Sequence, residues 1–390
     1  MLSERALIIC RALLTSIARH HYRGHIISRN HLTSETQHLA KAPAPKIPHP
    51  SGSIMETTHS PSTQGLPSNL LIDTGRPDQD DDFNDADSAL GSETYTLTTS
   101  LSPSVKDYRE ENGRRYHAFD SDAYFLPNDE IEAARLDLQH YTWKLTFGGN
   151  FGRVPLTSGD HIHRILDVGT GTGIWAMEVA DAFPEKEVVG TDLSPIQPDF
   201  VPPNCEFVVD DVEREWAWER KFDYVHCRML CLGMHDWPRF FRQCWENLNP
   251  GGWLETCEVQ FPPRRADQDL GNGSVGESKF LQWGEYVYES AAKAGIDARA
   301  SEKFSQQLGA QGFVNVSRVD IQWPLRPWPK GKKNKVMGKL LYENTLQAIP
   351  AIAMALFTRH LGWTKEDVDK FCEECQKEVD DVSNHFYYPM

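Results

Sequence analysis

The sequence lacks several features that define whole classes of protein. Eight cysteines are spread over 390 residues without a clear secretory signal, which argues against a small disulfide scaffold and leads us to expect reduced intracellular thiols. No stretch approaches the ~20 apolar residues of a membrane span. Basic residues are outnumbered 40 to 56, and the net charge of −16 disfavours binding to nucleic acid or an anionic membrane. We therefore expect a small-molecule or protein partner.

The first 105 residues contain little that could build a core. Residues 1–54 carry seven Lys or Arg against two acids, and together with apolar residues near the start this composition resembles a mitochondrial transit peptide. Met55 fits equally well as the true initiator. The Ser, Pro, Gly and Asp residues that follow cannot bury enough apolar surface to become ordered. We predict a disordered extension over 1–105 and one domain over 106–390, in the cytoplasm or nucleus, or in mitochondria if residues 1–54 are genuine.

Beyond residue 160 the pattern alternates between short apolar runs and helical segments. Alternation of this kind predicts an α/β fold: a doubly wound, mostly parallel sheet with right-handed crossovers and helices on both faces. The predicted strands cover 164–168, 187–191, 206–209, 222–227, 253–259 and 312–323. The predicted helices cover 174–183, 237–248, 280–293, 301–308 and most of 336–382.

A further helix is predicted before the sheet. Asn128 is a capping residue, and acids follow it where the helix dipole favours them. The spacing then predicts an apolar docking face, composed of Ile131, Ala134, Leu138, Tyr141 and Leu145.

A glycine-rich segment lies where the first predicted strand passes into a helix. It reads Asp167-Val168-Gly169-Thr170-Gly171-Thr172-Gly173. Glycines allow a ligand to approach the backbone closely, and free N–H groups at a helix N-terminus favour an anionic group. We therefore predict a nucleotide-type site, and the run Gly171-x-Gly173-x-x-Ala176 would also satisfy a dinucleotide fingerprint.

Three acids close three successive predicted strands. Asp167 would repel a pyrophosphate but could help to hold an amino group, which favours an amino-acid tail such as that of S-adenosylmethionine. Asp192 could accept both ribose hydroxyls, as it could in a nicotinamide site, and Asp211 could take the exocyclic amine of adenine. Each acid taken singly could instead be a helix cap.

These motifs together resemble the fungal LaeA-like class I methyltransferases. The resemblance rests on Ile165 to Ala176, Gly190 to Pro198, Val201 to Asn204 and Asp210 to Glu213, and extends over about 108–388 through Arg115 to His117, Tyr124 to Glu130, Pro250 to Gly252, Leu361 to Trp363 and His385. It implies a seven-stranded class I fold and S-adenosylmethionine as cofactor. It places the methionine moiety on the loop from Asp167 to Gly173, including Gly169 and Gly171, the ribose on Asp192 and the adenine on Asp211.

The resemblance also implies a last strand inserted antiparallel beside the fifth. The sequence stops at Met390, shortly after His385, so we expect either that another segment fills this slot or that the chain continues.

Methyl transfer depends mainly on orientation and needs a base only if the acceptor must lose a proton. We therefore assign no catalytic residue. Five polar residues near the sheet edge are candidates for positioning or packing: His226, Arg228, His235, Glu255 and Glu258. Tyr116, His117 and Tyr124 form either a lid or ordinary packing.

No metal site is predicted, because Cys372-x-x-Cys375 has no second pair and fits an ordinary helix face. The basic run Lys330 to Lys335 is typical of a solvated loop, although it also resembles a nuclear address.

The functional hypothesis is an S-adenosylmethionine-dependent methyltransferase that acts on a small natural-product intermediate in fungal secondary metabolism. The alternative is a LaeA-type nuclear regulator that works through protein partners.

Overall fold

A computed structural model describes residues 96–97, 108–117, 124–266 and 278–390. Apart from the short strand β1 (Thr96–Leu97), the predicted disordered extension lies outside the described residues. The domain boundary near residue 106 therefore stays a prediction.

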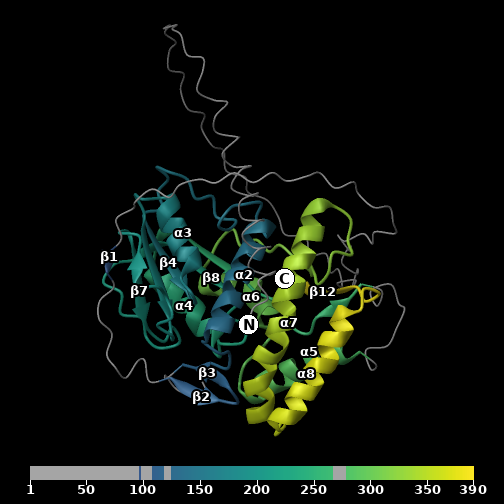
Figure 1. Cartoon of the computed structure of the whole chain (residues 1–390). Helices are drawn as coiled ribbons and strands as arrows, with labels where there is room; N and C mark the ends of the chain where they lie inside the picture. Colours follow the sequence, from purple (N-terminus) through teal and green to yellow (C-terminus); the bar gives the residue numbers. More distant parts are fainter. Residues whose placement is uncertain (1–95, 98–107, 118–123, 267–277) are drawn as a thin grey trace, which may run out of the picture. The chain divides into compact units, whose positions relative to one another are not determined.

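The central sheet has five parallel strands (Figure 1). They are β4 (Arg164–Val168), β5 (Glu187–Asp192), β7 (Cys205–Val209), β8 (Phe222–Arg228) and β9 (Leu248–Cys257). Their spatial order is β7-β5-β4-β8-β9, so successive crossovers run outward from β4 in one direction and then outward from β8 in the other. The gap between the carboxyl ends of β4 and β8 is thus a topological switch point, where ligands bind in folds of this class. The predicted doubly wound α/β fold is confirmed.

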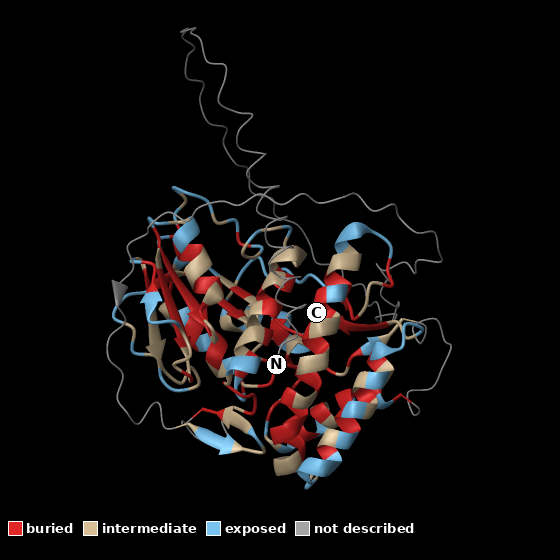
Figure 2. Ribbon diagram, viewed as in Figure 1, coloured by how far each residue is buried: buried red, intermediate tan, exposed pale blue. Residues whose placement is uncertain are grey.

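Helices cover both faces of this sheet. Helix α3 (Ile174–Ala182) packs on one face through Trp175 and Val179. On the other face lie α4 (Trp237–Asn247) and α6 (Phe304–Gln311), which follows a short 3-10 turn, η3 (Ala300–Lys303). The inner strands β4, β5 and β8 are mostly buried between these layers (Figure 2), which explains their continuous apolar sequences.

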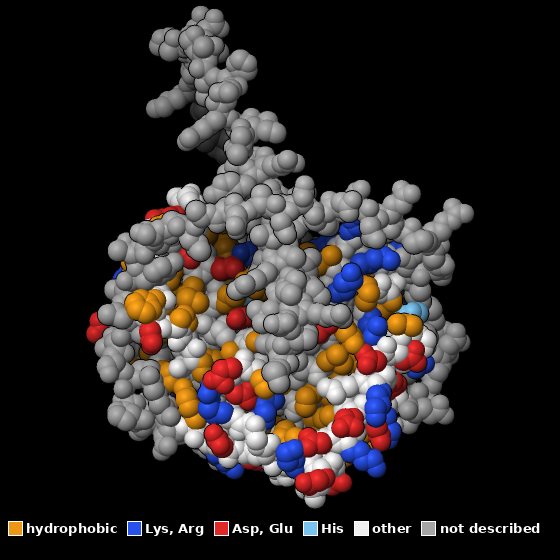
Figure 3. All heavy atoms as spheres, viewed as in Figure 1, with side chains coloured by type: hydrophobic (Ala, Val, Ile, Leu, Met, Phe, Trp, Pro, Cys, Tyr) orange, Lys and Arg blue, Asp and Glu red, His pale blue; other side chains and the backbone are white. Residues whose placement is uncertain are grey.

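A second core lies beside the sheet. It joins α5 (Lys279–Lys293), α7 (Lys332–His360) and α8 (Lys365–Asp380), with α2 (Glu130–Thr146) packed along α7 (Figure 1). By length and composition α7 could cross a membrane, a property that the apolar-run analysis missed. Most of its apolar window is buried inside this second core. The exposed side of α8 alternates charges of opposite sign, and the face in Figure 3 shows acidic and basic side chains intermingled over these helices.

Helix α2 differs from its prediction in two respects. Its N-cap is Asp129, whose carboxylate accepts from the Glu132 N–H, and not Asn128. The predicted apolar face is buried only in part: Leu138 is buried and Leu145 packs against the second core, whereas Ile131 is 50% exposed. The helix instead buries a largely polar set: Glu132, Arg135, Leu138, Gln139, His140, Thr142 and Trp143. These polar groups can be buried because they find hydrogen-bond partners within α2, where Arg135 pairs with Glu132, and on α7, where Arg135 donates to Asn344.

The far edge of the sheet also departs from expectation. Residues 313–321 do not form the predicted sixth strand, and only β11 (Gln322–Pro324) is a strand in this region. The end of the chain, β12 (Phe386–Pro389), pairs with β11 and with β10 (Arg264–Arg265) in a separate small sheet. Over the described residues no strand pairs with the outer edge of β9, so residues 313–321 have no neighbouring ladder that would hold them extended.

Two other small pairings complete the described structure. Strand β1 pairs with β6 (Phe200–Val201), and β2 (Arg109–Glu111) forms a hairpin with β3 (Arg114–Tyr116) across an Asn112-Gly113 turn with positive φ at both residues.

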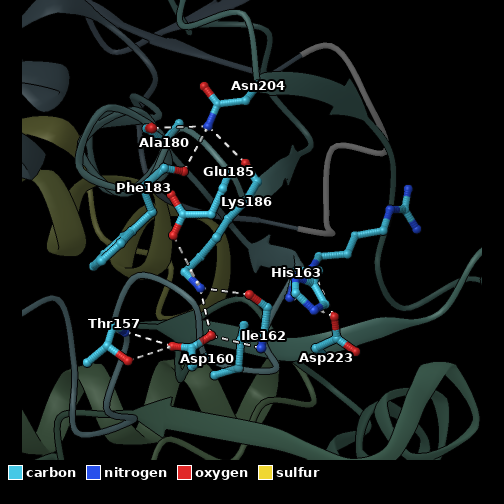
Figure 4. Close-up of polar contacts among 11 residues, drawn as sticks. Thr157, Asp160, Ile162, His163, Ala180, Phe183, Glu185, Lys186, Asn204 and Asp223 are labelled. Carbon is cyan, nitrogen blue, oxygen red and sulfur yellow. Dashed lines mark hydrogen bonds and ion pairs between the residues drawn. The ribbon is translucent and has the colours of Figure 1, made fainter. Parts of the chain in front are cut away.

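At the amino edge of the sheet, two polar side chains tie the connections together (Figure 4). The Asn204 amide donates to the carbonyls of Ala180, Phe183 and Lys186. The Lys186 ammonium is 1% exposed and donates to Asp160 at 2.7 Å and to the Ile162 carbonyl at 2.8 Å. Burial opposes ionisation of Asp160, but the hydrogen bonds from Lys186 and two backbone N–H groups outweigh it and lower the pKa to about 2.

We expect Lys186→Met to lower the free energy of unfolding by about 2 kcal/mol at pH 7, because it removes a charged, largely buried hydrogen-bond donor. The depressed pKa of Asp160 means that the pair stabilises the fold above the ordinary carboxyl range, and that this contribution disappears as the pH falls through about 2. Urea titrations at several pH values should show the difference from wild type shrinking towards pH 2. Lys221→Met, at an exposed lysine, is the control; equal effects of the two substitutions would contradict the account.

Candidate functional site

A pocket opens at the carboxyl edge of the sheet, at the switch point between β4 and β8. Its wall combines the glycine-rich turn after β4, the ends of β5 and β8, one side of α2 and the loop that follows β8. Of the six residues predicted for the cofactor, four line this pocket: Asp167, Gly169, Gly171 and Asp192.

The turn after β4 requires glycine. Gly169 and Gly173 have φ values of 66° and 79°, in the left-handed region that other residues avoid. A Cβ on Gly173 would lie 2.4 Å from the Phe207 ring, and one on Gly169 would lie 2.3 Å from Leu230. Gly173 is thus the N-cap of α3 and packs against β7, although it does not line the pocket.

The hydrogen bonds of the turn differ from the prediction, in which free N–H groups would bind an anionic group of the ligand. The Thr170 N–H donates to the Thr191 carbonyl of β5, the Gly173 N–H donates to the Thr170 carbonyl, and the Gly171 N–H donates to the Asp192 carboxylate at 2.8 Å. The protein therefore supplies its own anion at this position. A pyrophosphate placed here would be repelled by the Asp192 carboxylate, which weighs against the dinucleotide alternative.

Asp192 at the end of β5 organises this part of the wall. Its two oxygens accept the N–H groups of Gly171 and Ser194, and Gln197 donates to the Gly171 and Ser194 carbonyls. Burial raises the pKa of Asp192 to about 6, against the lowering effect of the two N–H groups. The role of Gln197 was missed, because a single Gln in a loop carries no sequence signal.

The third predicted acid lies differently. Asp211 accepts from the Glu213 N–H and from Arg214, so it caps its own turn, while its neighbour Asp210 lines the pocket. The structure thus places Asp210, and not Asp211, where it could meet a ligand. Sequence reasoning cannot choose between adjacent acids, because neighbouring side chains diverge at the end of a strand.

Asp167 and His226 form a buried pair in the pocket wall. They are register partners on β4 and β8, and His226 Nδ1 lies 2.7 Å from Asp167 Oδ1. The Thr170 hydroxyl donates to the other carboxylate oxygen at 2.6 Å. The imidazole stacks on Trp175 with ring centroids 3.8 Å apart and planes 5° apart. Its ring orientation is therefore fixed from two sides.

Helix α2 contributes polar groups that were not predicted. Arg135 and Gln139 line the pocket, and Arg135 forms a buried bidentate pair with Glu132. His140 lies against Arg228 and Glu178. The hydrogen bond from His140 and the ion pair with Lys144 outweigh the burial of Glu178 and lower its pKa to about 2. These polar residues recur every three or four positions along α2, but their burial depends on partners distant in sequence, such as Asn344.

Two of the candidate acids accept hydrogen bonds from backbone N–H groups. Glu258 accepts from the Leu230 and Cys231 N–H groups and so fixes the pocket loop after β8, and burial raises its pKa to about 8. Glu255 binds the Arg153 and Val154 N–H groups and the Tyr224 hydroxyl. These acids position the chain, as anticipated.

The other candidates divide between the pocket and its surroundings. His235 lies outside the pocket wall and pairs with Glu213, which raises its pKa. Tyr124 lines the pocket, whereas Tyr116 packs under Arg359 and His117 contacts the Tyr124 carbonyl. Seven cysteines, Cys372 and Cys375 among them, are free and buried in the described structure, where no group of side chains forms a metal site.

Comparison with known proteins gives consistent matches. A family model described as a methyltransferase domain matches residues 115–318. Methyltransferase pytC of Aspergillus terreus is 38% identical over 277 residues, covering 71% of this chain and 84% of the relative. The secondary metabolism regulator laeA of Aspergillus flavus is 31% identical, covering 76% and 79%. The protein-methionine methyltransferase laeA of Emericella nidulans is 31% identical, covering 76% and 78%.

The turn provides a test of the pocket geometry. Gly173→Ala should lower the free energy of unfolding by about 2–4 kcal/mol, from left-handed strain plus the collision with Phe207. Gly113→Ala is the matched control, because Gly113 has φ 82° and a Cβ added there would meet no atom within 4 Å, so only the strain remains. Phe207→Leu should recover part of the Gly173→Ala loss in thermal or urea unfolding. Equal costs at Gly113 and Gly173 would contradict the packing described.

Proposed function

The chain belongs to the methyltransferase-domain family that includes pytC and laeA, and it is an S-adenosylmethionine-dependent methyltransferase. We propose that it methylates a small intermediate of fungal secondary metabolism. The observation that carries this proposal is the pocket at the switch point, where a left-handed glycine turn meets two strand-end carboxylates.

The pocket residues fit this donor. Asp192 has both oxygens anchored by backbone N–H groups and lies in the wall, where its remaining lone pairs could accept ribose hydroxyls. Asp210 is the acid placed to meet an adenine amine, with Leu193 and Val212 as apolar neighbours. The bare backbone at Gly169 and Gly171 allows close approach of the chain that joins the ribose to the amino-acid end.

The bound donor supplies a methyl group activated by a positively charged sulfur. The residues of the chain then act by orientation, because an in-line displacement needs the acceptor atom opposite the leaving sulfur. Tyr124, Leu232 and Phe261 supply apolar and aromatic surface around the remaining space, which excludes water from the reacting atoms. We assign no catalytic base.

Asp192→Asn should weaken binding of S-adenosylhomocysteine at least tenfold, because it removes a charged hydrogen-bond acceptor. Wild-type affinity should fall below pH 6, by up to about tenfold per unit, as Asp192 with its raised pKa takes up a proton. The variant should show no such step. Calorimetry across pH 5–8 measures both effects, with Glu219→Gln at an exposed site as control. Unchanged affinity of Asp192→Asn would contradict the ribose assignment.

The acceptor is addressed by a transfer assay. Purified protein with isotope-labelled S-adenosylmethionine should label a small molecule in extracts of a fungal culture that produces secondary metabolites, and Asp192→Asn should abolish the labelling. We propose a small-molecule acceptor because Tyr124, Leu232 and Phe261 line the pocket with apolar and aromatic surface. Label that enters only macromolecules would contradict it.

A methionine thioether is a second candidate acceptor. Met229 lines the pocket with φ 61°, a left-handed conformation rare for such a residue. The laeA relative of Emericella nidulans supports this candidate, because it is named a protein-methionine methyltransferase. Transfer to this sulfur would convert a thioether into a sulfonium and needs no proton acceptor, consistent with a site to which no base is assigned.

Incubation of the pure protein with S-adenosylmethionine alone tests this candidate. Intact-mass and peptide mass spectrometry should find one added methyl group on Met229, lost in Met229→Leu and retained in Met234→Leu, a methionine of the same pocket. An unmodified chain after prolonged incubation would exclude the thioether as acceptor.

A regulatory role through protein partners is the remaining alternative, and the laeA relatives support it. We place the protein in the cytoplasm or nucleus, or in mitochondria if residues 1–54 direct it there. Fluorescent fusions of the full chain and of a chain that starts at Met55 separate these locations, and accumulation in the nucleus would favour the regulator.

A further inference from the structure

Arg228 is a cation without a carboxylate partner in the pocket wall. It closes β8, and its guanidinium contacts the imidazole of His140 at 3.3 Å. Across the described residues no carboxylate lies within ion-pair distance of it. Burial lowers the pKa of Arg228, and Asp167 and Glu178 oppose that shift from farther away. Arg228 is partly buried, and a cation without a carboxylate partner in a pocket wall can take an anionic group from a ligand.

The nearby acids are already engaged. Glu178 binds Lys144 and His140, and Asp167 accepts from Thr170 and His226. The other arginine of the pocket wall, Arg135, is paired with Glu132 on its own helix. The wall therefore presents one arginine whose hydrogen-bonding capacity is largely unused.

His226 presents a complementary atom from the same strand. Because the Asp167 carboxylate can only accept, the hydrogen of this contact lies on His226 Nδ1, which leaves Nε2 as the ring nitrogen that a ligand could meet. The side chain is 1% exposed, and Nε2 has no partner among the described residues. A buried acceptor of this kind calls for a donor from a ligand.

Residues 226 and 228 point to the same face of β8, about 7 Å apart along the strand. An α-amino acid presents a carboxylate and an ammonium on the same carbon atom, so it can contact two side chains that share one face of a strand. Its carboxylate would meet Arg228 in a bidentate contact, and its ammonium would donate to His226 Nε2, whose charge partner Asp167 lies behind it.

We propose that Arg228 and His226 together bind the α-amino-acid end of the methyl donor, Arg228 taking the carboxylate and His226 Nε2 the ammonium. The assignment rests on the proposed function, and it moves the recognition of the methionine moiety from the glycine-rich turn to the end of β8. Asp167 then acts as a positioning residue that fixes the tautomer of His226.

The test compares two ligands by calorimetry: S-adenosylhomocysteine, and 5′-methylthioadenosine, which lacks the amino-acid end. Arg228→Gln should weaken S-adenosylhomocysteine about ten- to hundredfold and leave 5′-methylthioadenosine unchanged. Arg228→Lys should recover part of the loss, since it restores charge without the bidentate geometry. Arg220→Gln, at the opposite edge of the sheet where Arg220 pairs with Glu187, should change neither affinity.

A pair of substitutions tests His226. Asn at this position can still donate to Asp167 but has no atom where Nε2 was, whereas Gln can place a polar atom near Nε2. His226→Asn should lose affinity for S-adenosylhomocysteine alone, and His226→Gln should lose less. Melting temperatures of all variants show whether each is folded.

The outcomes separate this inference from the proposed function. Wild-type protein that binds neither ligand would overturn the proposed function. Binding of both ligands with equal affinities of wild type and Arg228→Gln for S-adenosylhomocysteine would overturn the inference alone. A parallel loss for both ligands would show that Arg228 acts through the fold, and would overturn the inference as well.

Discussion

The structure depends on the turn that joins β4 to α3. A completely buried central strand must pass into a helix within five residues, and it does so through three glycines with positive φ. The sharp turn leaves open the carboxyl edge of the sheet between β4 and β8. Its backbone is stabilised by Asp192, a carboxylate from the next strand, and not by a ligand phosphate. Because a carboxylate of the protein already binds this turn, the pocket favours a ligand that places no phosphate group there.

The other elements around the pocket hold its polar side chains in place. Helix α2 turns a polar face to the pocket because α7 and the second core bury its remaining surface. Glu258 holds the loop after β8 by two backbone N–H groups, and Trp175 and Asp167 fix His226. The polar groups of the wall are thus held rigidly by buried contacts, which is the condition for orienting a substrate without a catalytic base.

Much of this could be predicted from the sequence, for physical reasons that differ by element. Strands such as β4 and β5 are buried on both faces, so their apolar runs are unambiguous, and the glycines mark a turn that other residues cannot adopt. The face of α2 could not be predicted, because its polar residues are buried by partners distant in sequence, such as Asn344. The choice of Asp210 over Asp211 depends on local backbone direction. Residues 313–321 do not form the predicted strand because, among the described residues, no strand lies beside the outer edge of β9 to pair with them.

The central claim is that this pocket is built for a nucleoside with an amino-acid tail and not for a dinucleotide. The most direct test is calorimetric titration of the full chain with S-adenosylhomocysteine and, separately, with NADH. The account predicts saturable binding of about one S-adenosylhomocysteine per chain with micromolar affinity, within the ordinary range for small ligands, and no heat from NADH. Binding of NADH with no response to S-adenosylhomocysteine would contradict it.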